Sequence, residues 1–302
     1  MKFPKLLFLI PLIFLTVSSC SSDDSSQDNE PEVVNPTSQK LISVVYPSSQ
    51  LMAYSMPREQ YRYDNLKRIN SILSPGYLNG VTYVNDNLIE VDLLLENVSN
   101  ADIEQKTVMH LKSNIIEFSI TNKIFRLTDT KAIYRVDRDS TVYTYENEYV
   151  SRVMVYHKTL IQGDGKYRLE NQIDSKVTNG NITELKRIEF GKVIITNYTY
   201  DTNPSISMGD LAYDTPLFLM GGLFNIILKD RLGKKSANNI IAIENTYEEI
   251  PFDKSYKKIN FKRNLDKYGR LSEILMSGSA ITSNVNNVST DFTDEKVIFK
   301  YE

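Results

Sequence analysis

The chain has 302 residues, of which 35 are basic and 38 acidic, and it contains two histidines, one cysteine and no tryptophan. This mildly acidic balance argues against a nucleic-acid-binding surface, because such surfaces are rich in clustered lysine and arginine. A single cysteine excludes an intramolecular disulfide, so a hydrophobic core must stabilise the fold by itself.

The N-terminus has the pattern of a secretory signal that ends at a cysteine. Lys2 and Lys5 form a basic start, an apolar run extends from Leu6 to Val17, and two serines precede Cys20. The apolar run is shorter than the ~20 residues that cross a bilayer, whereas this arrangement is typical of a cleaved signal. We therefore predict a lipoprotein signal peptide over 1–19 and a membrane anchor through lipid on the thiol of Cys20. The alternative is a transmembrane anchor in which this cysteine is simply a buried apolar residue.

A serine-rich and acidic stretch follows the cysteine. It opens with Ser21, Ser22, Asp23 and Asp24, and residues 20–38 contain almost nothing apolar. A segment of this composition stays disordered, which predicts a solvated tether. The serine and acidic cluster resembles the surface-export signal of lipoproteins from Bacteroidota. That resemblance implies an outer-membrane protein that faces the cell exterior.

Residues 39–302 are dominated by short stretches of alternating polarity that are rich in Tyr, Ile, Val and Thr, the residues that favour strands. Strands are predicted at Leu41–Tyr46, Gly80–Tyr83, Leu88–Leu95, Ile115–Ile120, Thr141–Tyr145, Val150–Tyr156, Val193–Tyr200, Lys258–Lys262 and Val297–Tyr301. Because they follow one another at hairpin spacing, we predict an all-β domain. It is a long antiparallel meander that forms a curved sheet or open barrel, undivided or in two halves near 39–135 and 136–302.

Turn residues separate the predicted strands. Asn179-Gly180 is the dipeptide favoured in type I′ hairpin turns, because both central residues need a positive φ. Asn79-Gly80, Asn85-Asp86-Asn87 and Gly163-Asp164-Gly165 are also predicted to be turns.

One apolar segment departs from the β pattern. Leu217–Leu228 is almost continuously apolar, with a pair of glycines at its centre and Pro216 before it. Proline is favoured in the first turn of a helix, so we predict a short helical segment near 216–229 that covers one face of the sheet. A buried strand is the alternative.

A tyrosine motif recurs along the chain. Pairs of tyrosines two residues apart, which share one face of a strand, precede an acidic residue in Tyr61-Arg62-Tyr63-Asp64, Tyr143-Thr144-Tyr145-Glu146 and Tyr198-Thr199-Tyr200-Asp201. A later hairpin contains Asp266 and then Gly269-Arg270-Leu271, in which glycine permits the left-handed backbone of a tight turn. These motifs are expected to be structural.

The motif resembles the YD hairpins of RHS-type repeat proteins. It resembles more closely the uncharacterised surface lipoproteins of Bacteroidota that carry Y-x-Y-D…G-R-L hairpins, and the resemblance is best over residues 179–302. It implies a β-rich envelope domain and no particular chemistry.

Residues that carry chemistry are few. His110 and His157 have no second histidine or cysteine at ligand spacing, which excludes an ordinary zinc site. No metal ligand and no cofactor is assigned. The chain has no Gly-x-Ser-x-Gly motif of a serine hydrolase. A glycosidase needs only two carboxylates, and Asp137-Arg138-Asp139 is the most concentrated candidate. The same pair could hold calcium through oxygen ligands, and the alternative is a charged hairpin end.

Three functions follow from these patterns, and no catalytic residue is assigned. We favour a non-catalytic surface protein that binds a glycan, a peptide or a partner lipoprotein, because tyrosine faces stack on sugars and contribute to interfaces. The second hypothesis is a hydrolase of an extracellular polymer that uses a carboxylate pair. The third is a structural or assembly component of the envelope.

Overall fold

The computed structural model describes residues 41–45, 58–74, 77–98, 101–161, 163–189, 191–206, 231–247, 254–282 and 289–302. The chain divides into two compact units, 1–35 and 36–302, and all described residues belong to the second. The predicted signal peptide, Cys20, the acidic cluster that follows it and the predicted helix near 216–229 lie outside the described residues.

The described residues form sixteen strands. They are β1 (Leu41–Val45), β2 (Arg58–Tyr63), β3 (Ile69–Ser74), β4 (Tyr77–Asn85), β5 (Leu88–Val98), β6 (Ala101–Lys112), β7 (Ile115–Leu127), β8 (Ile133–Glu146), β9 (Tyr149–Ile161), β10 (Arg168–Thr178), β11 (Asn181–Glu189), β12 (Lys192–Pro204), β13 (Asn238–Tyr247), β14 (Lys254–Leu265), β15 (Leu271–Thr282) and β16 (Ser289–Tyr301). Within these residues no helix is long and apolar enough to span a membrane.

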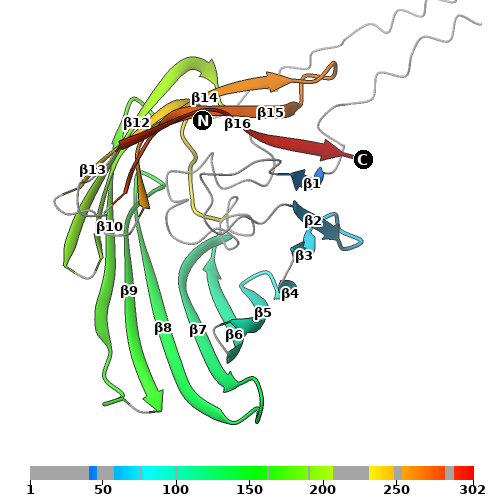
Figure 1. Ribbon diagram of the computed structural model, residues 1–302, viewed down its shortest axis with the longest axis vertical. Coiled ribbons are helices and arrows are strands. Elements are labelled where there is room, and N and C mark those ends of the chain that lie inside the picture. Colours follow the sequence, from blue (N-terminus) through cyan, green and yellow to red (C-terminus); the bar gives the residue numbers. More distant parts are fainter. Residues whose placement is uncertain are drawn as a thin grey trace, which may run out of the picture. The chain divides into compact units, whose positions relative to one another are not determined.

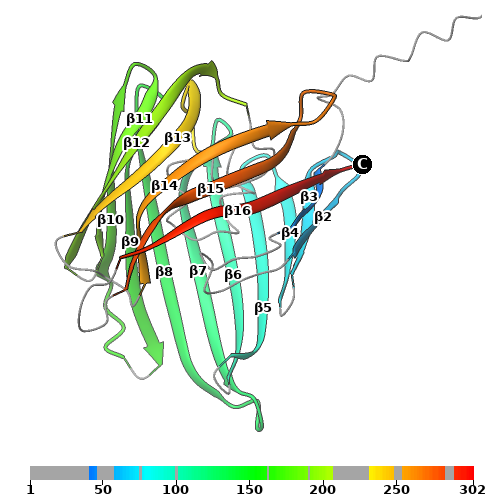
Figure 2. The same cartoon turned by 45° about the horizontal axis from the view of Figure 1, so that its top comes forward.

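Every strand pairs antiparallel with its neighbour in the chain, which confirms the predicted all-β meander (Figures 1 and 2). The first strand, β1, pairs with β2 on one side and with β16 on the other. The hydrogen-bonded order therefore returns to its starting point. Both ladders of β1 are short, with three residue pairs to β2 and four to β16.

The predicted strands all fall in observed strands, apart from Tyr46, which lies outside the described residues. Asn179 and Gly180 have φ values of 51° and 77°, as the type I′ turn requires. The turn predicted at Asn79-Gly80 is wrong. Gly80 lies inside β4 and pairs with Ser71 and with Asp92, because the strand alternation continues through it and gives ladder partners on both sides.

Alternation along the strands separates two faces of the sheet. In β5, Ile89 and Val91 are buried, whereas Glu90 between them points to the opposite side and pairs with Lys106 of β6 at 2.8 Å. We call the side of the buried residues the core face and the other side the outer face. Further cross-strand ion pairs are Arg126–Glu104 at 2.8 Å and Arg152–Asp174 at 2.5 Å. The outer face of these strands is therefore charged.

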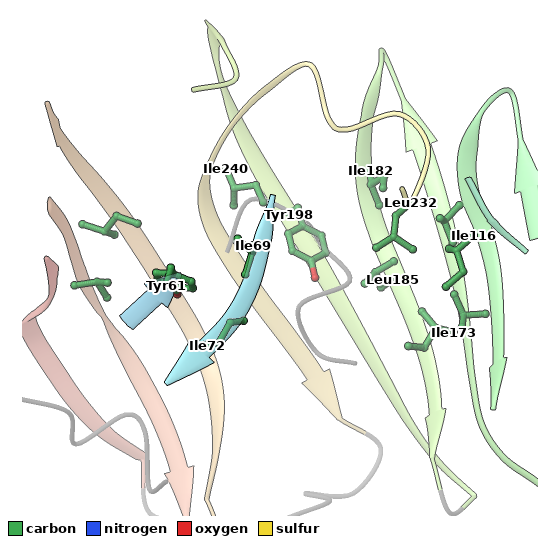
Figure 3. Packing of buried hydrophobic residues seen from close by; sticks show 14 of the residues in the cluster. Tyr61, Ile69, Ile72, Ile116, Ile173, Ile182, Leu185, Tyr198, Leu232 and Ile240 are labelled. Carbon is green, nitrogen blue, oxygen red and sulfur yellow. The ribbon is translucent and has the colours of Figure 1, made fainter. Parts of the chain in front are cut away.

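The core face carries one apolar cluster, shown in part in Figure 3. Its fully buried members include Ile72, Ile116, Leu185 and Ile274, which come from strands far apart in the sequence. Complete burial of one such side chain contributes about 1.5–3 kcal/mol. The cluster therefore holds the meander together across its length.

A segment between β12 and β13 adds to this cluster from one edge of the sheet. The carbonyl of Arg231 accepts from the amide of Ile116 at 2.9 Å, and the amide of Ala237 donates to the carbonyl of Gly180 at 3.0 Å. The amide of Lys234 donates to the Glu148 carbonyl at 2.8 Å. We call residues 231–237 the crossing segment, because it binds the ends of the β6–β7, β8–β9 and β10–β11 hairpins. Its Leu232 joins the core (Figure 3).

Tyrosine hydroxyls bind the same edge of the sheet. In each case the hydroxyl donates to a carbonyl at the start of an earlier strand: Tyr83 to Ile69 at 3.1 Å, Tyr145 to Ile116 at 2.6 Å, Tyr200 to Ile182 at 2.6 Å and Tyr301 to Leu271 at 2.9 Å. Burial raises the pKa of Tyr200 to about 12, so its hydroxyl keeps the proton that it donates. These bonds explain why tyrosines recur near the turns.

The turn between β2 and β3 has the same structure as the turn between β14 and β15. Oδ1 of Asp64 accepts from the amides of Leu66 and Arg68, both at 2.9 Å, and its Oδ2 lies 2.7 Å from Nη2 of Arg68. The guanidinium group lies 4.0 Å from the ring centroid of Tyr83. The bond from the Arg68 amide, with the other bonds from Arg68 and Leu66, holds the pKa of Asp64 below its ordinary value. Lys67 has a φ of 61°.

The turn between β14 and β15 repeats this arrangement. Oδ1 of Asp266 accepts from the amides of Tyr268 and Arg270, at 2.8 and 3.0 Å, and Arg270 lies 4.6 Å from the ring centroid of Tyr301. Gly269 takes the left-handed position, with a φ of 76°. Asp266, Gly269 and Arg270 therefore take the positions that Asp64, Lys67 and Arg68 occupy in the first turn.

The close approach of the crossing segment predicts a difference between two glycines. Gly233 and Gly191 both have a φ of 77°, but a Cβ on Gly233 would lie 2.2 Å from the carbonyl oxygen of Glu148, whereas one on Gly191 would meet nothing within 4 Å. Both alanine variants should lose about 1 kcal/mol through the left-handed backbone. Gly233→Ala should lose about 1–3 kcal/mol more, as measured by urea unfolding. Equal losses would show that the segment does not lie there.

Candidate functional site

The core face of β7 to β10 changes from apolar to charged with distance from the crossing segment. Near that segment it carries Ile116 and Val150, which are buried in the apolar cluster. Further along, cross-strand registers place Lys123 opposite Asp137 and place Asp139 opposite His157. Together with Arg135, Thr159 and Glu170, these residues make up what we call the charged cluster.

Asp139 lies at the centre of the charged cluster and is 9% exposed. Its Oδ1 lies 2.7 Å from Nδ1 of His157, and its Oδ2 lies 2.7 Å from Nζ of Lys123. Because an ionised carboxylate can only accept hydrogen bonds, the proton of a neutral His157 ring stands on Nδ1. Nε2 lies 3.3 Å from the hydroxyl oxygen of Thr159, which can donate to it.

Asp137 forms the second ion pair and is only 2% exposed. Arg135 donates to both of its oxygens, from Nε at 3.0 Å and from Nη2 at 2.6 Å. This two-bond arrangement is the strongest form of a carboxylate pair, and the hydrogen bond to Asp137 raises the pKa of Arg135. Oδ1 of Asp137 also lies 4.0 Å from Nε2 of His157, so the ring stands between two carboxylates.

Glu170 reaches the charged cluster through an irregularity in β10. Leu169 pairs with Tyr156 and Asn171 pairs with Val155, so Glu170 is the extra residue of a β-bulge. Bulges redirect side chains, and they occur often beside functional sites. Here one carboxylate oxygen of Glu170, one of Asp139 and a ring nitrogen of His157 lie within 4.8 Å of one another.

The carboxylate pair singled out in the sequence, Asp137 and Asp139, does lie on one face. Each member is nevertheless paired with its own cation, Arg135 or Lys123. A glycosidase needs one carboxyl that carries a proton to the leaving group, and this arrangement does not favour such a group. The geometry therefore gives no support to the hydrolase hypothesis.

The two histidines differ in their surroundings. His110 stacks on Phe118, with ring centroids 4.2 Å apart. His157 instead lies in the charged cluster, which sequence spacing did not indicate because its partners come from other strands. The only local signal was that Asp139 lies just before the predicted strand Thr141–Tyr145 and His157 just after the predicted strand Val150–Tyr156. Their pairing depends on the register.

The motif tyrosines point into the core. Tyr61 and Tyr198 are buried, and the partly buried Tyr63, Tyr143, Tyr145 and Tyr200 pack against the apolar cluster. Asp201 accepts hydrogen bonds from Asn203 and Asn239. The tyrosines that we considered as a ligand-binding face are thus placed where they support the fold.

Exposed apolar side chains lie at the other ends of the same four strands. They are Leu127, Ile133, Leu160, Ile161, Tyr167 and Leu169, each 40–51% exposed. Because β7 to β10 run antiparallel, the end of one strand and the start of the next meet at one edge, away from the crossing segment (Figure 1). We call these six residues the apolar edge.

No protein family model and no curated protein matches the chain. Among solved structures it resembles a porin-like protein from Bacteroides vulgatus ATCC 8482, with a TM-score of 0.50 and 12% identity over 87% of this chain and 99% of the other. A porin-like protein from Bacteroides uniformis ATCC 8492 has a TM-score of 0.49 and 12% identity, over 87% of this chain and 98% of the other. At this identity the likeness to the first of these shows the fold alone.

Proposed function

We propose that this chain is a lipoprotein of the outer membrane that faces the cell exterior and acts there as a non-catalytic interaction protein. Lipid on Cys20 anchors it, and the acidic tether holds the β domain away from the membrane. The apolar edge is the observation that carries the interaction role. A structural or assembly role in the envelope is the special case in which the partner stays bound.

The apolar edge has the composition of a contact surface for another protein. Grouped exposed apolar residues are uncommon on a domain surface unless they bind something. Charged groups border them: Nζ of Lys158 lies 4.2 Å from the ring centroid of Tyr167, and Arg168 pairs with Asp164 at 2.6 Å. An apolar centre with a charged rim is typical of protein interfaces. We therefore favour a peptide or partner lipoprotein over a glycan.

The outer face supports a domain that sits in water. Cross-strand pairs such as Lys106–Glu90 and Arg126–Glu104 are stable in water, whereas a basic side chain against the middle of a bilayer costs about 2–4 kcal/mol. The description of the Bacteroides vulgatus protein as porin-like agrees with an envelope location for this chain. It gives no reason to propose that this chain forms a pore.

The anchor predicts the behaviour of Cys20→Ala. Without the thiol no diacylglycerol can be attached, so the variant should remain as an uncleaved precursor or leave the membrane fraction. Three quantities are measured: processing and membrane attachment by detergent partitioning, lipid attachment by incorporation of a labelled fatty acid, and surface exposure by protease treatment of intact cells. A Cys20→Ala protein that is cleaved and retained like the wild type would contradict the anchor.

The interaction role predicts that binding depends on the apolar edge. The double variant Ile133→Ser/Leu169→Ser should lose at least about tenfold in partner binding and less than about 0.5 kcal/mol in stability, because both side chains are exposed. Val177→Ser is the matched control, since Val177 is exposed at the far end of β10. Cross-linking in intact cells, followed by binding of the purified partner, measures the effect. Equal binding by all three proteins would refute the proposal.

A further inference from the structure

We propose that Asp139, His157 and Glu170 form a binding site for a divalent transition-metal cation of the class of Zn²⁺ or Mn²⁺. This site lies on the core face and is independent of the proposed interaction role. It also goes against the expectation from sequence spacing that the chain holds no metal.

The donor set fits such a cation. One imidazole nitrogen and two carboxylate oxygens suit zinc and manganese, whereas calcium and magnesium prefer oxygen donors alone. Three protein ligands with a further position for water are the usual arrangement of an accessible zinc site. Ligand atoms about 2.1 Å from a tetrahedral metal lie roughly 3.4 Å apart. The three atoms, which lie within 4.8 Å of one another, need to shift by only about an ångström.

His157 would bind the metal through Nδ1, the nitrogen beside Asp139. When a metal takes Nδ1, the ring proton moves to Nε2, and the number of protons on the neutral ring is unchanged. The hydroxyl oxygen of Thr159, at 3.3 Å, and Oδ1 of Asp137, at 4.0 Å, are the acceptors near that nitrogen. A carboxylate or hydroxyl behind a ligating histidine fixes its tautomer and orientation.

The charge of the cluster also favours a cation. Lys123 and Arg135 supply two positive charges, whereas Asp137, Asp139 and Glu170 supply three negative ones. Arg135 pairs with Asp137, and Lys123 pairs with Oδ2 of Asp139. Oδ1 of Asp139 and the carboxylate of Glu170 are therefore the oxygens that would bind the metal. The ammonium group of Lys123 opposes the cation and weakens its binding.

The test is a calorimetric titration of the purified full chain with ZnCl₂, and with MnCl₂ as a second probe. Every protein carries Cys20→Ala, so that an unlipidated thiol cannot bind zinc. We expect one saturable site per chain, its loss in His157→Gln and at least about tenfold weaker binding in Glu170→Gln. Lys123→Met should bind zinc several-fold more tightly, which a purely structural ion pair would not predict.

His110→Gln is the matched control, since it removes the other histidine and should leave the affinity unchanged. Glu170→Gln keeps the shape of a half-buried side chain at a bulge, so it remains informative if His157→Gln fails to fold. Absence of a saturable site in the reference protein would overturn the proposal. So would wild-type affinity in Glu170→Gln, or an equal loss in the two histidine variants. The partner-binding experiment tests the apolar edge and not the metal site. The interaction role and the metal site can therefore be refuted independently of each other.

Discussion

The two-residue repeat of the β-strand is the constraint on which this structure depends, because it sends alternate side chains to opposite faces. In a meander of sixteen strands, each strand contributes to both faces of one sheet. The apolar cluster and the charged cluster then share the core face, while ion pairs such as Lys106–Glu90 occupy the outer face. A register shift of one residue in any strand would exchange these environments.

Tyrosine hydroxyls and the crossing segment hold the strand ends at one edge of the sheet. The hydroxyls of Tyr145 and Tyr200 donate to carbonyls of the preceding strands, and Leu232 of the crossing segment joins the apolar cluster. The tyrosine bonds join strands that are neighbours in the sheet, whereas the crossing segment joins three separate hairpins. The apolar part of the core face lies toward this edge, and the opposite ends of β7 to β10 carry polar and exposed residues.

A contribution to the stability of the fold does not by itself explain why the core face carries the charged cluster. Buried ion pairs often contribute little, because desolvation offsets their attraction. Asp137 and Asp139 would be replaceable by apolar residues if they served only to fill the core. Their close association with His157, and the bulge that brings Glu170 to them, therefore favour a binding role for this part of the sheet.

Local patterns in the sequence were sufficient to predict the fold class, nine of the sixteen strands and the Asn179-Gly180 turn, because alternation and positive φ are properties of neighbouring residues. The turn at Asn79-Gly80 was wrongly predicted. This dipeptide favours a turn, but Gly80 pairs with residues of both neighbouring strands and therefore stays extended. The charged cluster could not be predicted. It depends on a register between β8 and β9 and on the bulge at Glu170, neither of which has a signal in the local sequence.

The central claim is that the sheet brings Asp139 and His157 together on its core face. A double-mutant cycle with Asp139→Ala, His157→Ala and the double variant tests it most directly, with the free energy of unfolding as the measured quantity. Residues in direct contact should show a coupling of about 1–3 kcal/mol. Strictly additive effects, within about 0.3 kcal/mol, would contradict the register and with it the account of the charged cluster.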